Sequence, residues 1–252
     1  PIDMLAAADE VLAEDTRVAV KLMSAYGLKP KLSPYHDHNG AERRPGLLKK
    51  LSNGGVIALI SDAGTPLVSD PGWKLVHEAL EAGITVFPVP GASAMLAGLV
   101  ASGLPSDKFM FAGFLPSKST ARKTFCDNLK AVPSTLIFYE SGPRLAATLA
   151  DLSETLGGSR SAAVARELTK LFEETRRGTL AELANHYSEK GPPKGEIVLL
   201  IGPPEEQAFT QDTIDAALRE ALADHPMKAA ANAVAEAMNL SKRDIYQRAL
   251  KL

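Results

Sequence analysis

The stretch VIALISDAGTPLVSDPGW, residues 56–73, determines the architecture that we predict. Its apolar start, Val56–Ile60, is typical of a strand that is buried on both faces of a sheet. A loop rich in Gly, Asp, Ser and Pro follows directly, from Ser61 to Gly72. Ligands of open α/β sheets bind beyond the carboxyl ends of the strands, and glycines there let the backbone approach a ligand closely. We therefore expect a binding site at this strand end.

Outward from this stretch, short apolar runs alternate with helical patterns. The other predicted strands are Ile84–Val89, Phe109–Phe114, Thr135–Tyr139, Ser161–Ala165 and Ile197–Ile201. The predicted helices are Met4–Ala13, Pro45–Leu51, Trp73–Ala82, Ser93–Ser102, Thr120–Ala131 and Arg144–Leu156, and the end of the first also fits a short strand, Val11–Glu14. This alternation predicts an α/β protein with largely parallel pairing in its first half.

The chain divides into three predicted parts. We expect an N-terminal α/β domain with a parallel sheet over residues 1–105, a second α/β domain over residues 106–204, and a helical module over residues 205–252. Gly202-Pro203-Pro204-Glu205-Glu206 has the composition of a linker. Beyond it we predict two helices, Lys228–Met238 and Lys242–Leu250, the second capped by Ser241. This tail carries a local excess of basic residues, which favours a small RNA-binding module of helix-turn-helix type.

Composition excludes several classes of protein. The 252 residues are 45% hydrophobic and 23% charged, which is ordinary for a folded protein and excludes wholesale disorder. With 28 basic and 30 acidic side chains the net charge is −2, so binding of nucleic acid through bulk charge is not expected. The one cysteine, Cys126, excludes an internal disulfide and a four-cysteine zinc site. No apolar run reaches the roughly 18 residues of a membrane span and no signal peptide is evident, so we expect a cytoplasmic enzyme.

A second loop of small residues, from Pro88 to Ala94, follows the next predicted strand. One such loop is usually a tight strand-to-helix turn, but two at consecutive strand ends favour a shared site. The sequence contains neither G-x-G-x-x-G after a strand nor G-x-x-x-x-G-K-[ST], which excludes the common nucleotide-binding motifs. Both loops also lack Lys and Arg, which a triphosphate would require. This composition better suits a cofactor with a sulfonium and an amino-acid end.

A series of ordered motifs resembles a known family. The motifs are Ala13-Glu14-Asp15-Thr16-Arg17, Tyr35-His36-Asp37-His38-Asn39, Leu59-Ile60-Ser61-Asp62-Ala63-Gly64-Thr65-Pro66, Asp70-Pro71-Gly72, Pro90-Gly91, Gly103-Leu104-Pro105-Ser106-Asp107, Gly113-Phe114-Leu115-Pro116, Phe138-Tyr139-Glu140-Ser141 and Ala165-Arg166-Glu167-Leu168-Thr169-Lys170. Together with the helical tail they resemble the ribosomal RNA small subunit methyltransferase I family of the tetrapyrrole-methylase superfamily.

This resemblance implies both a fold and an activity. The implied fold has two α/β domains with a cofactor cleft between them, and the implied assembly is a homodimer. The implied reaction is 2′-O-methylation of a cytidine ribose in the decoding region of 16S rRNA, with S-adenosyl-L-methionine as cofactor and 16S rRNA or the small ribosomal subunit as partner. Family members begin with a strand and a Thr-Pro-Ile-Gly-Asn-Leu loop, whereas here Pro1-Ile2 leads directly into Asp3. We therefore expect one wall of the cofactor site to be missing from this sequence.

The resemblance also implies which residues contact the cofactor. Asp62, Ala63, Gly64, Thr65 and Val68 are expected to face the methionine part, with Ser93 and Ala94 close by. Glu140 and Leu168 are expected to frame the adenosine. These assignments come from the resemblance. The sequence pattern by itself supports only the placement of these positions at the ends of strands.

The acceptor side needs a group that helps to deprotonate a ribose hydroxyl, which is a very weak acid. Without the resemblance, Glu14-Asp15-Thr16-Arg17 reads as a helix cap with a surface ion pair. With it, we predict Asp15 as base or substrate ligand, Arg17 as a phosphate or ribose clamp, and Glu14 as a substrate contact.

The His36-Asp37-His38-Asn39 loop is a second candidate. In an extended segment His36 and His38 share one face. They could be structural loop residues whose hydrogen bonds are satisfied within the protein, or they could contact RNA or transfer a proton. A metal site would need a third ligand, and none is evident, so we expect no metal. We predict a catalytic role for both histidines and a substrate contact for Asn39.

Further cations are candidates for binding RNA. Arg144 is as suited to the start of a helix as to an RNA contact, Arg166 is predicted to pair with Glu167 at the cleft, and Lys170 to extend a basic surface. Three cations, Lys118, Arg122 and Lys123, form either a solvated helix face or an RNA contact, and Lys228, Lys242, Arg243 and Arg248 populate the tail. Trp73 is predicted to pack in the core rather than to serve as a platform for a base, because it begins an amphipathic helix.

Two other functions compete with the rRNA ribose methyltransferase. A superfamily relative could methylate a tetrapyrrole or a protein, but it would have no basic tail. A non-catalytic RNA-binding or ribosome-assembly factor would lack affinity for S-adenosylmethionine.

Overall fold

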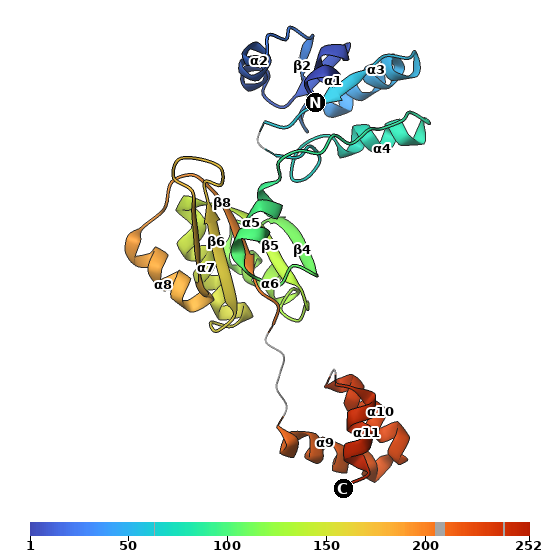
Figure 1. Cartoon of the computed structure of the whole chain (residues 1–252), viewed down its shortest axis with the longest axis vertical. Coiled ribbons are helices and arrows are strands. Elements are labelled where there is room, and N and C mark those ends of the chain that lie inside the picture. The colour runs from blue at the N-terminus through green and yellow to red at the C-terminus, as the bar shows by residue number, and fades with distance from the viewer. Residues whose placement is uncertain (63, 205–209, 239) are drawn as a thin grey trace. The chain divides into compact units, whose positions relative to one another are not determined.

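The computed structural model describes residues 1–62, 64–204, 210–238 and 240–252. The chain forms two compact units, Pro1–Pro204 and Glu205–Leu252 (Figure 1). Within the described ranges no helix combines the length and the apolar character that crossing a membrane requires.

The first unit begins with a small parallel sheet. Its strands are β1 (Glu10–Ala13), β2 (Leu32–Pro34) and β3 (Ile57–Leu59), in the order β2-β1-β3. The helices of this region are α1 (Ile2–Ala7), α2 (Thr16–Ala25), α3 (Gly40–Ser52) and α4 (Trp73–Glu81). Both pairings of β1 are parallel, as predicted for the first half of the chain.

Two predictions for this region are wrong. The helix predicted over Met4–Ala13 ends at Ala7, and its second half forms β1, as the alternative strand prediction had indicated. The strand predicted over Ile84–Val89 does not form, and Phe87 within it is 74% exposed. An apolar, β-branched run becomes a strand only where a neighbouring edge offers ladder hydrogen bonds, and this segment pairs with no described strand.

A five-stranded mixed sheet follows, in the order β4-β5-β8-β6-β7. Its strands are β4 (Phe109–Phe114), β5 (Thr135–Ser141), β6 (Ser161–Arg166), β7 (Glu174–Thr179) and β8 (Glu196–Ile201). Only β4 and β5 pair in parallel, while β8 runs antiparallel between β5 and β6. Strand β7 was not predicted, because its charged sequence ETRRGT lacks an apolar pattern.

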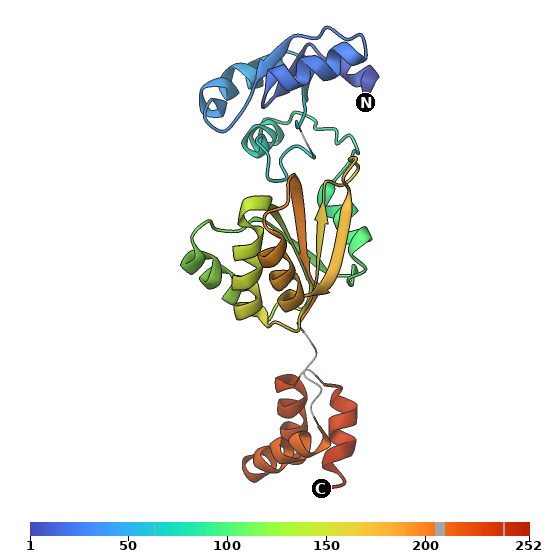
Figure 2. The ribbon, with the colours of Figure 1, turned by 90° about the vertical axis from the view of Figure 1, so that its left-hand side faces the viewer.

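Both faces of this sheet are covered by helices, as Figures 1 and 2 show. The helices are α5 (Ala94–Ser102), α6 (Ser119–Asp127), α7 (Gly142–Leu156) and α8 (Leu180–Lys190). Leu136 and Phe138 of β5 pack with leucines of α7 and α8, whereas Ile137 packs on the opposite face with Leu99 of α5. This alternation explains why β5 reads as a continuous apolar run.

The second unit is a cluster of three helices, α9 (Gln211–Asp224), α10 (Met227–Ala237) and α11 (Lys242–Ala249). Helix α9 was not predicted, whereas α10 and α11 match the two predicted tail helices within two residues. The Ser241 hydroxyl accepts the Asp244 N–H and caps α11 as expected. Ile214 and Leu218 of α9 pack with Val234 and Ile245.

A buried carboxylate ties the small sheet together. Glu10 of β1 is 4% exposed, accepts a hydrogen bond from the Ser33 hydroxyl at 2.5 Å, and pairs with Lys31, Arg43 and Lys50. Burial by itself would raise the pKa of Glu10, but the hydrogen bonds from Ser33 and Lys50 and the charges of Lys31 and Lys50 outweigh it and lower the pKa to about 2.

We expect Glu10→Gln to destabilise the first unit at pH 7 by about 1–3 kcal/mol, because a pKa unit is worth about 1.4 kcal/mol. Because the pKa of Glu10 is lower in the folded state, its carboxylate stabilises the fold fully at pH values above the unfolded pKa of about 4.5. This stabilisation is lost as the pH falls towards 2 and the carboxylate becomes protonated. Urea unfolding from pH 7 to pH 3 should therefore show wild type and variant converging in acid. Glu42→Gln, at an exposed position of α3, is the control. A difference that did not depend on pH would contradict this account.

Candidate active site

Two hollows of the first unit share three lining residues, Ser69, Asp70 and Phe114. The first hollow has a volume of about 190 Å³. Its lining residues are Gly64, Val68, Ser69, Asp70, Ala94, Phe114, Tyr139, Glu140, Ala165, Leu168, Glu196, Ile197 and Val198. These come from the loop after β3, the start of α5, the ends of β4, β5 and β6, the loop after β6, and the start of β8. The first hollow therefore lies beyond the strand end where the sequence predicts a binding site.

Strained backbone marks the first hollow. Among the described residues, the non-glycine residues with positive φ are Leu67, Ser69, Glu167 and Thr169, with φ of 74°, 58°, 49° and 66°. All four lie in the two loops that contribute Val68 and Leu168 to the lining. Such conformations cost about 1–3 kcal/mol each and cluster at functional sites, so this strain independently points to the same place.

Side chains hold the loops of the site together. The Ser61 hydroxyl lies 2.5 Å from Asp70 Oδ2, and the Thr65 hydroxyl donates to the Ala92 carbonyl at 3.3 Å. The second contact joins the two glycine-containing loops, which the sequence suggested share one site. The Asp62 carboxylate accepts the Asp15 N–H at 3.2 Å, and so connects the loop after β3 to the predicted acceptor residues.

Of the predicted cofactor contacts that the structure describes, five line the first hollow and the others do not. Gly64, Val68, Ala94, Glu140 and Leu168 line the first hollow. Asp62, Thr65 and Ser93 belong to its loops without lining it, and Ala63 lies outside the described residues.

Sequence reasoning missed several lining residues, among them Ser69, Asp70, Phe114, Tyr139 and Glu196. A signal existed for some of them. Asp70 and Phe114 stand inside quoted motifs, and Tyr139 directly precedes Glu140.

The second hollow has a volume of about 510 Å³ and is lined by three of the predicted acceptor residues, Glu14, His36 and His38, whereas Asp15, Arg17 and Asn39 are not among its lining residues. Its lining residues are Glu14, His36, Asp37, His38, Leu67, Ser69, Asp70, Pro71, Trp73 and Phe114. The two runs quoted around Asp15 and His36 thus come together, because β1 and β2 are parallel neighbours whose carboxyl ends meet at one edge.

Asp15 and Arg17 form the cap and ion pair that the sequence had offered as the simpler alternative. The Asp15 carboxylate caps α2 by accepting the Arg17 N–H at 2.8 Å, and the Arg17 guanidinium pairs with it at 2.6 Å. The hydrogen bonds from Arg17 lower the pKa of Asp15 to about 2. A carboxylate with so low a pKa is a weak base. The geometry therefore favours a substrate-binding role for Asp15, and the Arg17 side chain, 89% exposed, is free to reach a second anion.

The two histidines lie together. The rings of His36 and His38 are 5.9 Å apart in an edge-on arrangement, and Asn39 fixes their loop by accepting the His36 N–H at 2.9 Å. His36 Nδ1 is buried and has no hydrogen-bond partner among the described residues. The described part of the chain contains no cluster of three or more metal-ligating side chains. His36 and His38 both line the second hollow.

Trp73 was predicted to pack in the core, and this is wrong. Its side chain is 57% exposed and lines the second hollow, where it stacks obliquely with His77 at 6.0 Å. The amphipathic pattern of α4 places its buried positions at Leu75 and Ala79, and the first residue of the helix falls outside that face.

The charge of the two hollows is of one sign. Asp70, Glu140 and Glu196 line the first, and Glu14 and Asp37 line the second, whereas no Lys or Arg is among the described lining residues of either. Acidic walls attract cations and repel phosphates. Glu140 pairs with Arg144 and Glu196 with Lys170, which reduces the negative charge of the first hollow. The remaining excess of carboxylates suits a cationic ligand better than a phosphate.

Comparison with known proteins identifies the family. The model of the Tetrapyrrole (Corrin/Porphyrin) Methylases matches residues 2–184, and the model described as the RsmI C-terminal HTH domain matches residues 208–252. The "Ribosomal RNA small subunit methyltransferase I" of Mesorhizobium japonicum is 52% identical over 251 residues, which cover 100% of this chain and 85% of that protein. The chain belongs to the ribosomal RNA small subunit methyltransferase I family. The expected resemblance is confirmed, and with it the enzyme class, methyltransferase.

Solved structures confirm the tetrapyrrole-methylase fold. Uroporphyrin-III C-methyltransferase from Thermus thermophilus, complexed with S-adenosyl homocysteine, has a TM-score of 0.52 at 20% identity and covers 80% of this chain and 88% of that one. Diphthine synthase has a TM-score of 0.59 at 15% identity, covering 80% and 82%. At these identities the likeness is one of fold alone.

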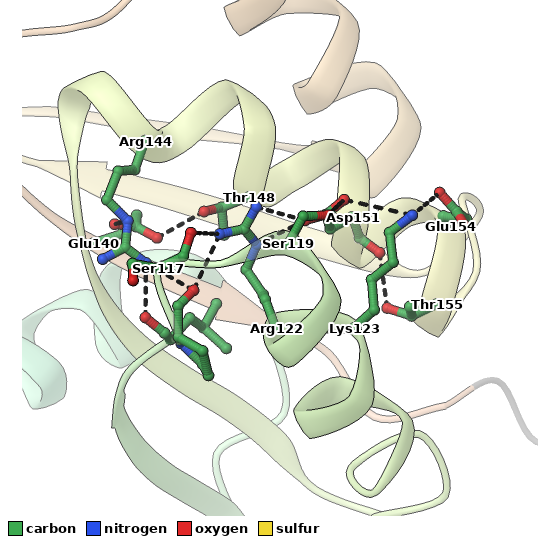
Figure 3. Close-up of polar contacts among 12 residues, drawn as sticks. Ser117, Ser119, Arg122, Lys123, Glu140, Arg144, Thr148, Asp151, Glu154 and Thr155 are labelled. Atoms are coloured by element: carbon green, nitrogen blue, oxygen red, sulfur yellow. Dashed lines mark hydrogen bonds and ion pairs between the residues drawn. The ribbon is translucent and has the colours of Figure 1, made fainter.

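In this member of the family Arg144 has a structural position. Its guanidinium donates to the Leu115 and Pro116 carbonyls at 2.7 and 3.2 Å and lies 3.3 Å from Glu140 (Figure 3). The Glu140 carboxylate is buried and also accepts hydrogen bonds from the Ser141 N–H and the Thr148 hydroxyl. Of the two roles predicted for Arg144, the contacts favour the structural one.

Arg122 is likewise not part of a solvated or RNA-facing surface. It is 4% exposed, forms a buried ion pair with Asp151, and donates to the Pro116 and Ser117 carbonyls (Figure 3). Lys123 beside it pairs with Glu154 at 2.6 Å.

Other predicted RNA ligands of this family member are also engaged in ion pairs. Arg166 pairs with Glu174 at 3.3 Å, not with Glu167 as predicted, because the neighbouring strand β7 places Glu174 directly opposite it. Lys170 lies 2.8 Å from Glu167 and 2.9 Å from Glu196. In the tail, Lys242 pairs with Glu236 and Arg248 with Asp215.

Because Arg122 is a buried partner of Asp151, we expect Arg122→Ala to cost up to about 3–5 kcal/mol of stability, the usual effect of removing one partner of a buried ion pair. Ser119 and Lys123 still contact the Asp151 carboxylate and offset part of this loss. Lys118→Ala, at an exposed neighbouring position, should change it by less than about 0.5 kcal/mol. Urea unfolding of both variants gives the comparison. Equal stability of the two variants would contradict the buried ion pair and would indicate that Arg122 lies on the surface.

Proposed function

We propose that this protein transfers a methyl group from S-adenosylmethionine to the ribose 2′-oxygen of a cytidine in the decoding region of 16S rRNA. The observation that carries the proposal is the pair of acidic hollows that share Phe114, Ser69 and Asp70, one suited to a cation and one lined by the histidine loop. Relatives that share up to 52% of the sequence are named for methylation of small-subunit rRNA, which supports the substrate class.

The residues of the first hollow fit this cofactor. S-adenosylmethionine carries a sulfonium and an ammonium group and no phosphate, so it suits a lining with Asp70, Glu140 and Glu196 and without Lys or Arg. Gly64 and Ala94 leave room for backbone contacts, and a structure of the same fold is described as complexed with S-adenosyl homocysteine.

When bound, the cofactor supplies an electrophilic methyl group with a good leaving group, so positioning is the main task of the protein. In our proposal Gly64, Val68 and Ala94 hold the methionine part, and Glu140 and Leu168 frame the adenosine. His36, with its buried and unpartnered Nδ1, is the group we assign to the proton of the ribose hydroxyl, and His38 lies beside it. Asp15 orients Arg17, which contacts a ribose or phosphate oxygen.

Cations outside the hollows support RNA as the partner. Residues 16–55 carry eight Lys or Arg against two Asp or Glu, although the whole chain has a net charge of −2. Exposed members without a described ion-pair partner include Lys21, Lys29 and Lys49. Surface lysines bind phosphates without regard to sequence, which makes such binding dependent on salt. A homodimer is part of the same proposal.

The deciding experiment incubates the protein with labelled S-adenosylmethionine and small subunits that lack the modification, and then maps the methylated nucleotide. Label on the 2′-oxygen of a decoding-region cytidine is the expected result. Absence of methyl transfer to both naked rRNA and assembled subunits would overturn the proposal. If cofactor binding were absent as well, the result would favour a non-catalytic RNA-binding factor. Label at another position would correct the substrate alone.

The cofactor assignment predicts that Ala94→Leu blocks the first hollow. Because added methylene groups in a packed site cost about 1–3 kcal/mol, we expect the Kd for S-adenosylhomocysteine to rise about tenfold or more. Titration calorimetry measures this directly. Ala97→Leu, on an exposed position of the same helix, should bind as wild type does. Unchanged binding to Ala94→Leu would place the cofactor elsewhere.

The acceptor assignment predicts that Asp15→Asn and Arg17→Ala each lower turnover with cofactor binding nearly intact. A charge-assisted hydrogen bond is worth about 1.5–3 kcal/mol, so the loss should be about tenfold or more. Steady-state kinetics on small subunits, paired with calorimetry, separates the two effects. Normal methylation by both variants would show that the acceptor site is not here.

A further inference from the structure

Phe114 is an exposed aromatic side chain in a rigid setting. It is 60% exposed and lines both hollows, so it stands where the cofactor and acceptor spaces meet. Its ring packs edge-on against Tyr139 at 5.6 Å, and Tyr139 in turn packs against Phe111 at 4.9 Å.

The backbone before Phe114 turns this side chain out of the regular strand. Phe111 pairs with Ile137 and Phe114 with Tyr139, so β4 carries one residue more than β5 over this interval. Such a bulge re-aims the side chains that follow it and is common beside active sites. Gly113 supplies the left-handed conformation that the irregularity needs, with φ of 67°.

The backbone after Phe114 is clamped by two arginines. Arg144 binds the Leu115 and Pro116 carbonyls, and Arg122 binds the Pro116 and Ser117 carbonyls (Figure 3). Both guanidinium groups are themselves held, by Glu140 and Asp151. Phe114 therefore presents its ring without the entropy cost of ordering a mobile loop.

Trp73 adds a second aromatic wall. It lines the second hollow with Phe114, His36 and His38, and it is more than half exposed. The hollow thus combines aromatic faces with polar groups that can donate and accept hydrogen bonds. A flipped-out nucleobase is recognised by this combination, through stacking on aromatic side chains and hydrogen bonds to its edge.

We infer that the second hollow takes the base of the target nucleotide, with Phe114 as its stacking platform and Trp73 as a second aromatic contact. This inference rests on the proposed RNA substrate. It makes Phe114 a substrate-binding residue, and it assigns Arg144 and Arg122 to positioning Phe114 rather than to contact with RNA. Stacking depends on a flat ring, so an aliphatic residue of similar size cannot replace it.

The test compares Phe114→Leu with Phe114→Tyr. Loss of stacking costs about 1–3 kcal/mol, so Phe114→Leu should raise the KM for small subunits about 5-fold to 150-fold, while the Kd for S-adenosylhomocysteine stays within about twofold. Phe114→Tyr keeps the ring and should restore the KM. Phe87→Leu, which removes an exposed aromatic residue outside both hollows, is the control and should behave as wild type.

A second readout does not need catalysis. Trp73 is the only tryptophan of the chain, so its fluorescence reports directly on the second hollow. An oligoribonucleotide with the decoding-region sequence should quench it, and Phe114→Leu should weaken the binding measured in this way. If wild type fails to methylate but shows this quenching, the proposed function fails and the inference stands.

Three results would overturn the inference. One is a KM of Phe114→Leu equal to that of wild type. Another is an equal loss of cofactor affinity in Phe114→Leu, which would make the ring only a wall of the cofactor site. The third is absence of tryptophan quenching at saturating oligoribonucleotide.

Discussion

The site depends on the burial of one carboxylate. Glu140, at the end of β5, is almost inaccessible to solvent, and a buried charge is tolerated only when it is paired and hydrogen-bonded. The Ser141 N–H, the Thr148 hydroxyl and the Arg144 guanidinium meet this requirement. Arg144 has further donors, and these bind the carbonyls that follow β4. The contacts that satisfy Glu140 thereby fix both the end of β5 and the loop that follows Phe114.

Charge is used differently inside and outside the site. Carboxylates line the two hollows, and the described cations nearest to them are engaged in ion pairs, such as Lys170 with Glu167 and Glu196. Exposed lysines lie instead on the helices and turns of residues 16–55. An acidic interior suits a cationic cofactor, while a basic exterior suits a polyanion. In the proposed function, this separation keeps the cofactor and the RNA on differently charged surfaces.

Much of the fold was predictable because it rests on local signals. The apolar runs at Phe109–Phe114, Thr135–Tyr139 and Ile197–Ile201 became β4, β5 and β8, since strands buried on both faces must be apolar throughout. Strand β7 was missed because it is charged, and the strand predicted at Ile84–Val89 failed because no described neighbour pairs with it. Arg122 and Trp73 were misjudged for a related reason, since burial depends on what the rest of the chain places opposite a residue.

By itself the sequence determined the alternation of strands and helices, the two small-residue loops, and the family, because these depend on residue order and local conformational preference. The tertiary structure alone decided which arginines are free and which are internal clamps, that His36 and Trp73 line one hollow, and that Phe114 stands between two. Those facts depend on contacts between residues far apart in the chain, such as Arg144 with Leu115 and Asp62 with Asp15. No local pattern encodes such contacts, because each is set by the packing of several elements at once.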